Sequence, residues 1–136
     1  MPLASGADLL DTTPEALYQK YAHYIVHQTT HLVVKPKNIP LYESWSKRAP
    51  QALHVLWTDT HNDRLVKTHY PQFAKLYDNV VLNIQRVDIV RLLYLHRYGG
   101  LYADIDYEAK ADPFLNLPTP HTDDAVFVVE SPIFLN

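Results

Sequence analysis

The chain contains no cysteine and only three glycines, Gly6, Gly99 and Gly100. The lack of cysteine excludes a disulfide framework, a thiol nucleophile and a thiolate zinc site. The shortage of glycine excludes the two glycine-rich phosphate loops, the P-loop and the dinucleotide fingerprint, whose backbone must approach phosphate closely. A nucleotide bound by this chain would therefore be held through a metal ion and side chains.

Strong positive charge and long apolar runs are also lacking. The formal net charge of -3 excludes a strongly basic surface, so we expect no nucleic-acid partner. No apolar run approaches the ~20 residues that a membrane span needs. Residues 1–11 lack the basic and apolar regions of a signal peptide. We therefore expect a soluble chain without a span of its own, in a compartment that the sequence leaves open.

What is present is typical of one folded domain, with 136 residues, 47% of them hydrophobic. Strands are predicted at 24–30, 52–58, 101–106 and 125–129, a strand or turn at 80–82, and helices at 14–21, 40–47, 59–69, 71–77 and 84–98. The alternation predicts an α/β fold, a mostly parallel sheet with helices on both faces. Because the chain stops soon after its last predicted strand, we expect the domain to be incomplete at the C-terminus.

Two aspartates at the end of the predicted strand 101–106 are the first candidates for chemistry. Period-two alternation would point Asp104 and Asp106 to the same side. Adjacent carboxylates repel unless positive charge lies between them, and a divalent metal that carries a phosphate commonly supplies it. Parallel sheets bind ligands beyond the carboxyl ends of their strands, where these aspartates are expected.

The predicted helix before the aspartates carries a second candidate pair. Its expected core face consists of Ile84, Val87, Tyr94, Leu95 and Tyr98, with Val90 at the edge. Asp88 and Arg91 fall in the middle of this face and are close enough to pair. Two interpretations stay open: a structural ion pair, or a cleft in which Arg91 meets phosphate or sugar oxygens and Asp88 accepts sugar hydroxyls. We favour the cleft, because the next element brings Asp104 and Asp106 there. Gly99 and Gly100 predict a left-handed C-cap followed by a tight turn.

These segments together resemble the sugar-transferase signature of glycosyltransferase family 32, which includes yeast-type α-1,6-mannosyltransferases and inositol-phosphoceramide mannosyltransferases. The residues that carry the resemblance are Asp88 and Arg91 in the helix, Tyr98-Gly99-Gly100 in the turn, Asp104 and Asp106 in the DxD, and the upstream segments 25–28, 43–45, 56–59 and 70–71. The resemblance covers about 24–113. The DxD alone is a weak signal, but its register with the helix and the glycine turn makes the match specific.

The resemblance implies a GT-A-like fold, that is, a Rossmann-like nucleotide-diphospho-sugar transferase. The domain division would be an N-terminal helical extension at 1–23 and the donor-side part of the domain at 24–136. The implied function is a metal-dependent retaining glycosyltransferase with Mn²⁺ or Mg²⁺. Its donor would be a nucleotide sugar, with GDP-mannose favoured and a UDP-hexose as the alternative, and its acceptor a glycan or glycolipid. The resemblance also implies relatives that are often anchored in the Golgi, while the compartment of this chain stays open.

The resemblance also implies roles for individual residues. Asp106 would be a metal ligand that contacts the diphosphate, while Asp104 would contact ribose or donor sugar and reach the metal directly or through water. Asp88 and Arg91 would hold the donor sugar. Residues placed near the nucleotide would be Ile25, His27, Gln28 and, stacking near the base, Trp57. Tyr102, beside the aspartates, is interpreted as a packing residue.

Two alternative functions would use the same residues differently. A non-catalytic nucleotide-sugar-binding module would need the donor site alone. A DxD phosphohydrolase is disfavoured, because such enzymes need a threonine two residues after the second aspartate, where this chain has Glu108. Within the transferase, a front-face displacement needs no protein nucleophile, whereas a double displacement would use Asp88.

Overall fold

The structure, a computed structural model, describes residues 3–115. The predicted strand at 125–129 lies outside these residues. Four strands form one sheet: β1 (Leu3–Ser5), β2 (Ile25–Thr29), β3 (Leu53–Trp57) and β4 (Leu101–Tyr102). Their order is β1-β3-β2-β4, and every neighbouring pair is parallel. The strands therefore all end at the same side of the sheet, which we call the carboxyl edge.

Helices connect the strands much as the sequence predicts. They are α1 (Gly6–Leu10), α2 (Pro14–Tyr21), α3 (Ile39–Arg48), α4 (Asp59–His69), α5 (Ala74–Asn79) and α6 (Asn83–Tyr98), with short 3-10 turns at Pro36–Asn38 and Pro71–Phe73. Thr13 caps α2 by accepting from the backbone N–H of Ala16, ahead of Pro14 in the first turn. The segment 80–82 is a bend, not a strand.

Strand β1 is the one element of the sheet that the sequence does not predict. Its three residues, Leu-Ala-Ser, contain no β-branched or aromatic side chain, so no local pattern marks them as a strand. The strand forms because it pairs with the buried strand β3, with Leu3 opposite His54 and Ser5 opposite Leu56. Tertiary pairing thus adds an edge strand inside the region 1–23.

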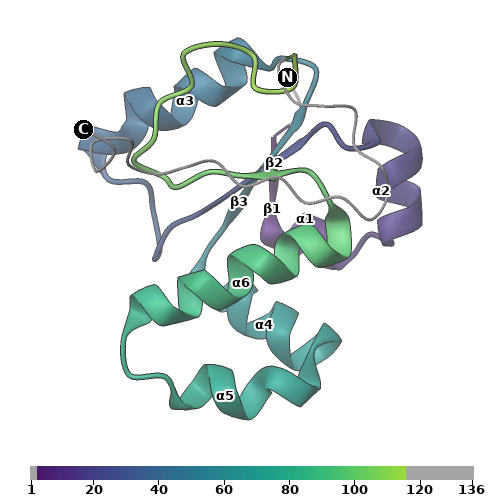
Figure 1. The fold of residues 1–136 in the computed structure, drawn as a ribbon, viewed down its shortest axis with the longest axis vertical. Coiled ribbons are helices and arrows are strands. Elements are labelled where there is room, and N and C mark those ends of the chain that lie inside the picture. The colour runs from purple at the N-terminus through teal and green to yellow at the C-terminus, as the bar shows by residue number, and fades with distance from the viewer. Residues whose placement is uncertain (1–2, 116–136) are drawn as a thin grey trace, which may run out of the picture.

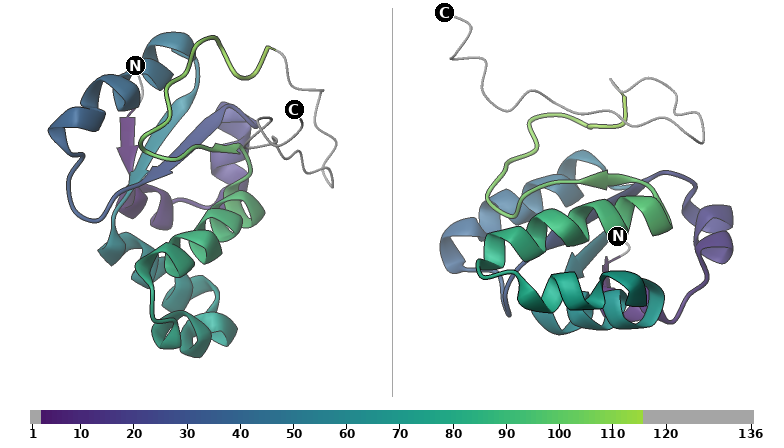
Figure 2. Two further views of the ribbon diagram at one scale, coloured as in Figure 1. Left: turned by 60° about the vertical axis from the view of Figure 1, so that its left-hand side comes forward. Right: turned by 60° about the horizontal axis from the view of Figure 1, so that its bottom comes forward.

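Helices cover both faces of the sheet, as expected for an α/β fold. Figures 1 and 2 show α3 on one side and α1, α4 and α6 on the other. The larger core lies on the α6 side, where side chains of β2 and β3 such as Ile25 and Trp57 pack against Val90 and Tyr94. The smaller core joins β2 and α3 to the segment that follows β4, through Val26, Trp45, Ala49, Ala103 and Ala109.

A fully buried histidine ties β2 to the end of α6. His27 Nε2 lies 2.9 Å from the carbonyl oxygen of Gly99, and Trp57 Nε1–H donates to His27 Nδ1 at 3.1 Å. Because the carbonyl can only accept and the indole can only donate, the ring is neutral with its proton on Nε2. Burial lowers the pKa of His27 to about 4, although the hydrogen bond to Gly99 opposes the shift.

This histidine predicts acid sensitivity of the fold. The pKa of His27 falls from 6.5 to about 4 on folding, so the unfolded chain binds the proton more tightly. The stabilisation is complete above pH 6.5 and is lost as the pH falls toward 4, by about 3 kcal/mol in the free energy of unfolding. Urea unfolding from pH 7 to 4 should show a shallower decline for His27→Gln than for the natural chain. Equal slopes would contradict this.

Gly99 and Gly100 end α6 by a geometry that other residues tolerate poorly. Gly99 is the C-cap with φ 70° and ψ -165°, so its φ is positive as predicted, but its ψ lies outside the left-handed helical region. Gly100 has φ 92°, and a Cβ there would lie 2.4 Å from the carbonyl oxygen of Ile25. The close approach lets β4 begin beside β2.

The two glycines predict unequal mutational effects. Gly99→Ala should lower the unfolding free energy by about 2 kcal/mol, because only backbone strain opposes the new methyl group. Gly100→Ala should lower it by about 4 kcal/mol, because the Cβ also collides with the backbone of β2. Chemical denaturation measures both values. A Gly100→Ala variant as stable as Gly99→Ala would show that β4 does not approach β2 so closely.

Candidate functional site

An arginine joins three other side chains at the carboxyl edge of the sheet. Arg91 Nη2 lies 2.8 Å from Asp88 Oδ1 on the same helix and 3.9 Å from Asp104 Oδ1 just beyond β4. Its guanidinium carbon lies 5.0 Å from the centre of the Tyr102 ring. Asp88, Arg91 and Asp104 keep 60%, 30% and 36% of their side-chain surface exposed, so a ligand can reach them. The structure thus brings together the helix pair and the first aspartate of the DxD.

The helix that carries the pair is rotated relative to the prediction. The buried residues of α6 are Val90, Leu93, Tyr94 and Tyr98, whereas Ile84, expected in the core, is 58% exposed. Because the contacts of α6 with the sheet involve its second half, residues near its start have no sheet to cover them. Asp88 and Arg91 therefore lie at the border of the buried stripe and not in its middle, which lowers the desolvation cost of the pair.

The DxD lies in a turn and not in a strand, contrary to the prediction for 101–106. Strand β4 ends at Tyr102, and the backbone N–H of Tyr107 donates to the carbonyl oxygen of Asp104 at 3.1 Å. The ladder with β2 continues only through Ala103 N–H, which donates to the carbonyl oxygen of His27 at 3.1 Å. Strand alternation consequently does not set the directions of Asp104 and Asp106.

Side chains from β2 and α3 hold this turn in place. Gln28, which is 2% exposed, donates from Nε2 to the carbonyl oxygen of Asp104 at 3.3 Å. Trp45 Nε1 donates to the carbonyl oxygen of Tyr107 at 2.8 Å, and Ser44 Oγ accepts from the backbone N–H of Ala109 at 2.8 Å. Sequence spacing cannot reveal these contacts, because they join residues more than sixty positions apart.

Tyr102 does more than the packing that the sequence suggests. Its hydroxyl donates to Asp104 Oδ1 at 3.0 Å. Burial, together with the carboxylate of Asp104, raises the pKa of the Tyr102 hydroxyl well above its usual range, so the group stays protonated and donates. Asp104 therefore has one oxygen held by Tyr102 near Arg91, and its second oxygen forms no hydrogen bond to another described residue.

Asp106, the second aspartate of the DxD, is open to solvent. It is exposed, and within residues 3–115 no hydrogen bond or ion pair engages its carboxylate. The same part of the chain contains no group of three or more His, Cys, Asp or Glu side chains arranged to hold a metal. Mg²⁺ and Mn²⁺ accept hard oxygen ligands, and Mg²⁺ is commonly held by one or two carboxylates together with substrate phosphates and water. Asp104 and Asp106 fit that ligand type.

Three residues expected near the nucleotide lie inside the protein. Ile25, His27 and Trp57 each have 0% of their surface exposed. Alternate residues of β2 and β3 point into the larger core, and Trp57 Nε1 bonds His27 there. The structure places these three side chains in the core, and their expected role near the nucleotide stays a prediction. Gln28, on the opposite face of β2, reaches the DxD turn through Asp104.

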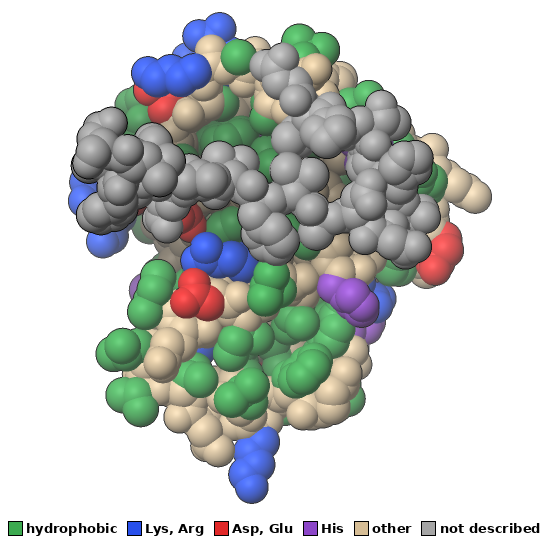
Figure 3. All heavy atoms as spheres, viewed as in Figure 1, with side chains coloured by type: hydrophobic (Ala, Val, Ile, Leu, Met, Phe, Trp, Pro, Cys, Tyr) green, Lys and Arg blue, Asp and Glu red, His purple; other side chains and the backbone are tan. Residues whose placement is uncertain are grey.

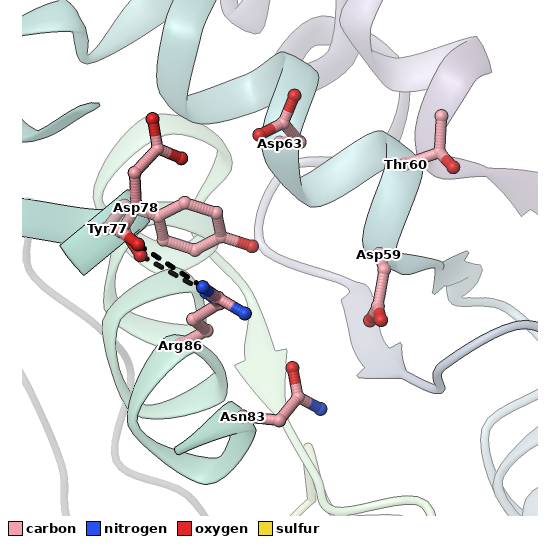
Figure 4. Close-up of a pocket in the computed structure, with 7 residues that line it drawn as sticks. All are labelled: Asp59, Thr60, Asp63, Tyr77, Asp78, Asn83 and Arg86. Atoms are coloured by element: carbon pink, nitrogen blue, oxygen red, sulfur yellow. Dashed lines mark hydrogen bonds between the residues drawn. The ribbon is translucent and has the colours of Figure 1, made fainter. Parts of the chain in front are cut away.

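A hollow of about 450 Å³ opens between α4, α5 and the start of α6. Figure 4 shows its lining residues: Asp59, Thr60, Asp63, Tyr77, Asp78, Asn83 and Arg86. Arg86 donates from Nε to the carbonyl oxygen of Tyr77 at 3.1 Å, so it closes one wall. We call this space the acidic hollow; the sequence does not predict it, because three separate helices line it.

Comparison with known families assigns the chain. The family model described as "Glycosyltransferase sugar-binding region containing DXD motif" matches residues 36–123, which include Asp88, Arg91, Asp104 and Asp106. The match covers more than half of the chain, and the chain belongs to this glycosyltransferase family. The family expectation drawn from the helix pair and the DxD is thereby confirmed.

Curated relatives are named as mannosyltransferases or as a mannosyl phosphorylinositol ceramide synthase. The chain is 36% identical over 97 residues to inositol phosphoceramide mannosyltransferase 3 of Schizosaccharomyces pombe, covering 69% of this chain and 27% of the relative. It is 35% identical over 103 residues to a mannosyl phosphorylinositol ceramide synthase of Saccharomyces cerevisiae, covering 69% and 26%. An initiation-specific α-1,6-mannosyltransferase of Candida albicans is 29% identical over 89 residues, covering 60% and 23%.

The chain spans about a quarter of the length of these relatives. No solved structure matches it. Among residues 3–115, no helix combines the length and apolar character that crossing a membrane requires.

Proposed function

We propose that this chain forms the donor-side part of a metal-dependent, retaining glycosyltransferase that moves mannose from GDP-mannose to a glycolipid. The observation that carries the proposal is the contact of Arg91 with both Asp88 and Asp104 at the carboxyl edge, within the segment that the DXD family model matches. In α/β sheets this edge is where nucleotide ligands bind.

Asp104 and Asp106 would hold the divalent cation, which, when bound, would offset the negative charge of the leaving diphosphate. Arg91 adds a fixed positive charge beside the same carboxylates and would stabilise diphosphate and sugar oxygens. Asp88 accepts from Arg91 and retains a second carboxylate oxygen for sugar hydroxyls. We favour the front-face displacement, which needs no protein nucleophile, over the double displacement that would use Asp88.

The acidic hollow supports a guanine nucleotide as donor. Its Asn83 and the site residue Arg91 are eight positions apart on α6, about 12 Å along the axis, a distance that an extended nucleoside diphosphate can span. The aspartates of the hollow suit N–H and O–H donors. Asp59 pairs with His31, and Asp63 and Asp78 pair with Lys67, through one carboxylate oxygen each. Guanine presents N1–H and N2–H₂ side by side to one carboxylate, whereas uracil presents a single N–H.

The acceptor proposal rests on the relatives. Two of them are named for inositol phosphoceramide or its mannosylated product, and they share about 35% identity with this chain. We infer that the acceptor is a lipid with a phosphoinositol headgroup, which carries a negative charge and free hydroxyls. A glycan acceptor is the alternative that the Candida relative suggests.

A nucleotide-sugar panel tests the proposal. The chain is incubated with Mn²⁺ and GDP-mannose, UDP-galactose or UDP-glucose, and we measure thermal stabilisation and release of nucleoside diphosphate. We expect stabilisation by GDP-mannose above the two UDP sugars, followed by slow release of GDP. Stabilisation without release, with or without an acceptor lipid, would instead favour the non-catalytic binding module. No response to any donor would contradict both.

A further inference from the structure

The loop that leaves β2 at the carboxyl edge exposes apolar and basic side chains together. We call residues 31–39 the basic loop. Leu32 and Val33 are each 70% exposed and Ile39 is 40% exposed. Lys35 and Lys37 are exposed between them. Large aliphatic side chains this exposed normally mark an interaction site when they are contiguous.

Hydrogen bonds hold the basic loop in its outward position. Thr30 Oγ1 donates to the carbonyl oxygen of Val33 at 3.1 Å, and Asp59 N–H donates to the carbonyl oxygen of His31 at 3.2 Å. On the far side, Asn38 N–H donates to the carbonyl oxygen of Lys35 at 2.8 Å, and Asn38 itself is buried. The loop is therefore tied to its own base at both ends, and its apolar tip does not fold back onto the protein.

The basic loop shares an edge with the candidate site. It begins after Thr29 at the end of β2, and β2 pairs directly with β4, whose end leads into Asp104 and Asp106. Figure 1 shows the connection from β2 to α3 on the side of the molecule where α6 begins and where the segment after β4 runs. A lipid or protein surface in contact with the basic loop would therefore lie beside the carboxyl edge, where Asp104 and Asp106 are exposed to ligands.

We propose that the basic loop docks onto an anionic lipid surface and so presents the site to lipid headgroups. This deepens the proposed function, on which it rests, by naming the surface from which the acceptor is taken. Leu32 and Val33 would enter the interface while Lys35 and Lys37 meet headgroup phosphates, the combination that interfacial segments use. The electrostatic attraction to anionic lipid would come from the lysines of the basic loop alone, because the whole chain has a net charge of -3.

A second apolar surface competes for this role. Phe73, Leu76, Val81, Leu82 and Ile84 are all at least 41% exposed where α5 leads into α6. Figure 3 shows hydrophobic side chains gathered over this part of the molecule. This surface, which we call the α5–α6 corner, has one exposed lysine, Lys75, offset by the exposed Asp78. It lacks the charge complementarity to anionic headgroups that favours the basic loop.

Vesicle co-sedimentation of the whole chain tests the docking. The probes are phosphatidylcholine vesicles and phosphatidylcholine vesicles with about a quarter phosphatidylinositol. We expect binding to the anionic vesicles that weakens with salt. Lys35→Gln with Lys37→Gln should reduce it about 25-fold, about fivefold for each lysine. Leu32→Ser with Val33→Ser should reduce it about tenfold or more.

Matched variants elsewhere serve as controls. Lys20→Gln with Lys47→Gln removes the same charge outside the loop, and Leu76→Ser with Leu82→Ser removes apolar surface from the α5–α6 corner. Both should bind like the natural chain. Circular dichroism checks that all four variants fold. We expect them to fold, because the substituted side chains are exposed.

Several outcomes overturn the docking proposal: no binding of the natural chain to anionic vesicles, equal loss in the charge control, or a larger loss in the corner control. Loss of self-association by the loop variants without vesicle binding would make the loop a protein interface. The Mn²⁺–GDP response separates this from the proposed function. If that response persists without vesicle binding, only the docking fails; if vesicle binding persists without the response, the donor assignment fails instead.

Discussion

Asp106→Asn is expected to lower the Mn²⁺-dependent affinity for GDP at least about 100-fold, a loss of about 3 kcal/mol. The substitution keeps the size of the side chain and removes one negative charge. Asp106 is exposed and engages no partner among residues 3–115, so the substitution breaks no hydrogen bond or ion pair within them. The melting temperature without ligand should stay unchanged.

The matched control lies two residues further along the same loop. Glu108→Gln removes a carboxylate that forms an ion pair with Lys110 at 2.7 Å, and both of these side chains are largely exposed. We expect it to keep the Mn²⁺–GDP affinity within about twofold, because exposed ion pairs contribute little. Isothermal titration calorimetry with GDP, with and without Mn²⁺, measures both variants. Equal affinities of Asp106→Asn and the natural chain would remove Asp106 from the metal site.

Arg91→Ala is expected to reduce donor binding and GDP release together by about 100-fold. Without the guanidinium, Asp88 and Asp104 would face the diphosphate as uncompensated negative charges. Arg91→Lys should recover part of the loss, leaving about tenfold, because lysine restores the charge but not the two-pronged geometry. The measurements are GDP-mannose affinity by calorimetry and release of GDP in the presence of Mn²⁺.

Arg64→Ala is the matched control for Arg91. Arg64 Nη2 pairs with Asp11 Oδ1 at 2.7 Å on the surface of α4, away from the DxD turn. It should change donor affinity by less than about twofold. If Arg91→Ala behaves like Arg64→Ala, Arg91 is a structural ion-pair residue, and the first interpretation of the Asp88–Arg91 pair would be the right one.

Sequence patterns predicted most helices and the buried strands, because local signals mark them. Pro14 after Thr13 marks a helix start, and the β-branched and aromatic residues of β2 and β3 mark strands. Elements that depend on distant partners were missed or misread. β1 exists through pairing with β3, and β4 stops after two residues because its continuation turns toward α3.

The sequence predicts which residues form the candidate site better than it predicts how they are arranged. Spacing alone predicted that Asp88 meets Arg91, and the helix–turn–strand order predicted that Asp104 lies near them. The buried position of His27 and the contact of Gln28 with the DxD turn depend on which face of β2 points to which core. The sequence predicts Tyr102 as a packing residue only, because its hydroxyl's hydrogen bond to Asp104 depends on the turn after β4, which strand alternation does not predict.

Direct observation of Mn²⁺ tests the central claim that carboxylates after β4 hold a metal together with a nucleoside diphosphate. The electron paramagnetic resonance signal of Mn²⁺ in solution is recorded with GDP alone, and then with increasing amounts of the chain. We predict that the chain removes free Mn²⁺ signal beyond the effect of GDP, and that Asp106→Asn does not. Two results would contradict the account. One is a natural chain that does not lower the free Mn²⁺ signal below its value with GDP alone, and the other is an Asp106→Asn variant that binds Mn²⁺ as well as the natural chain.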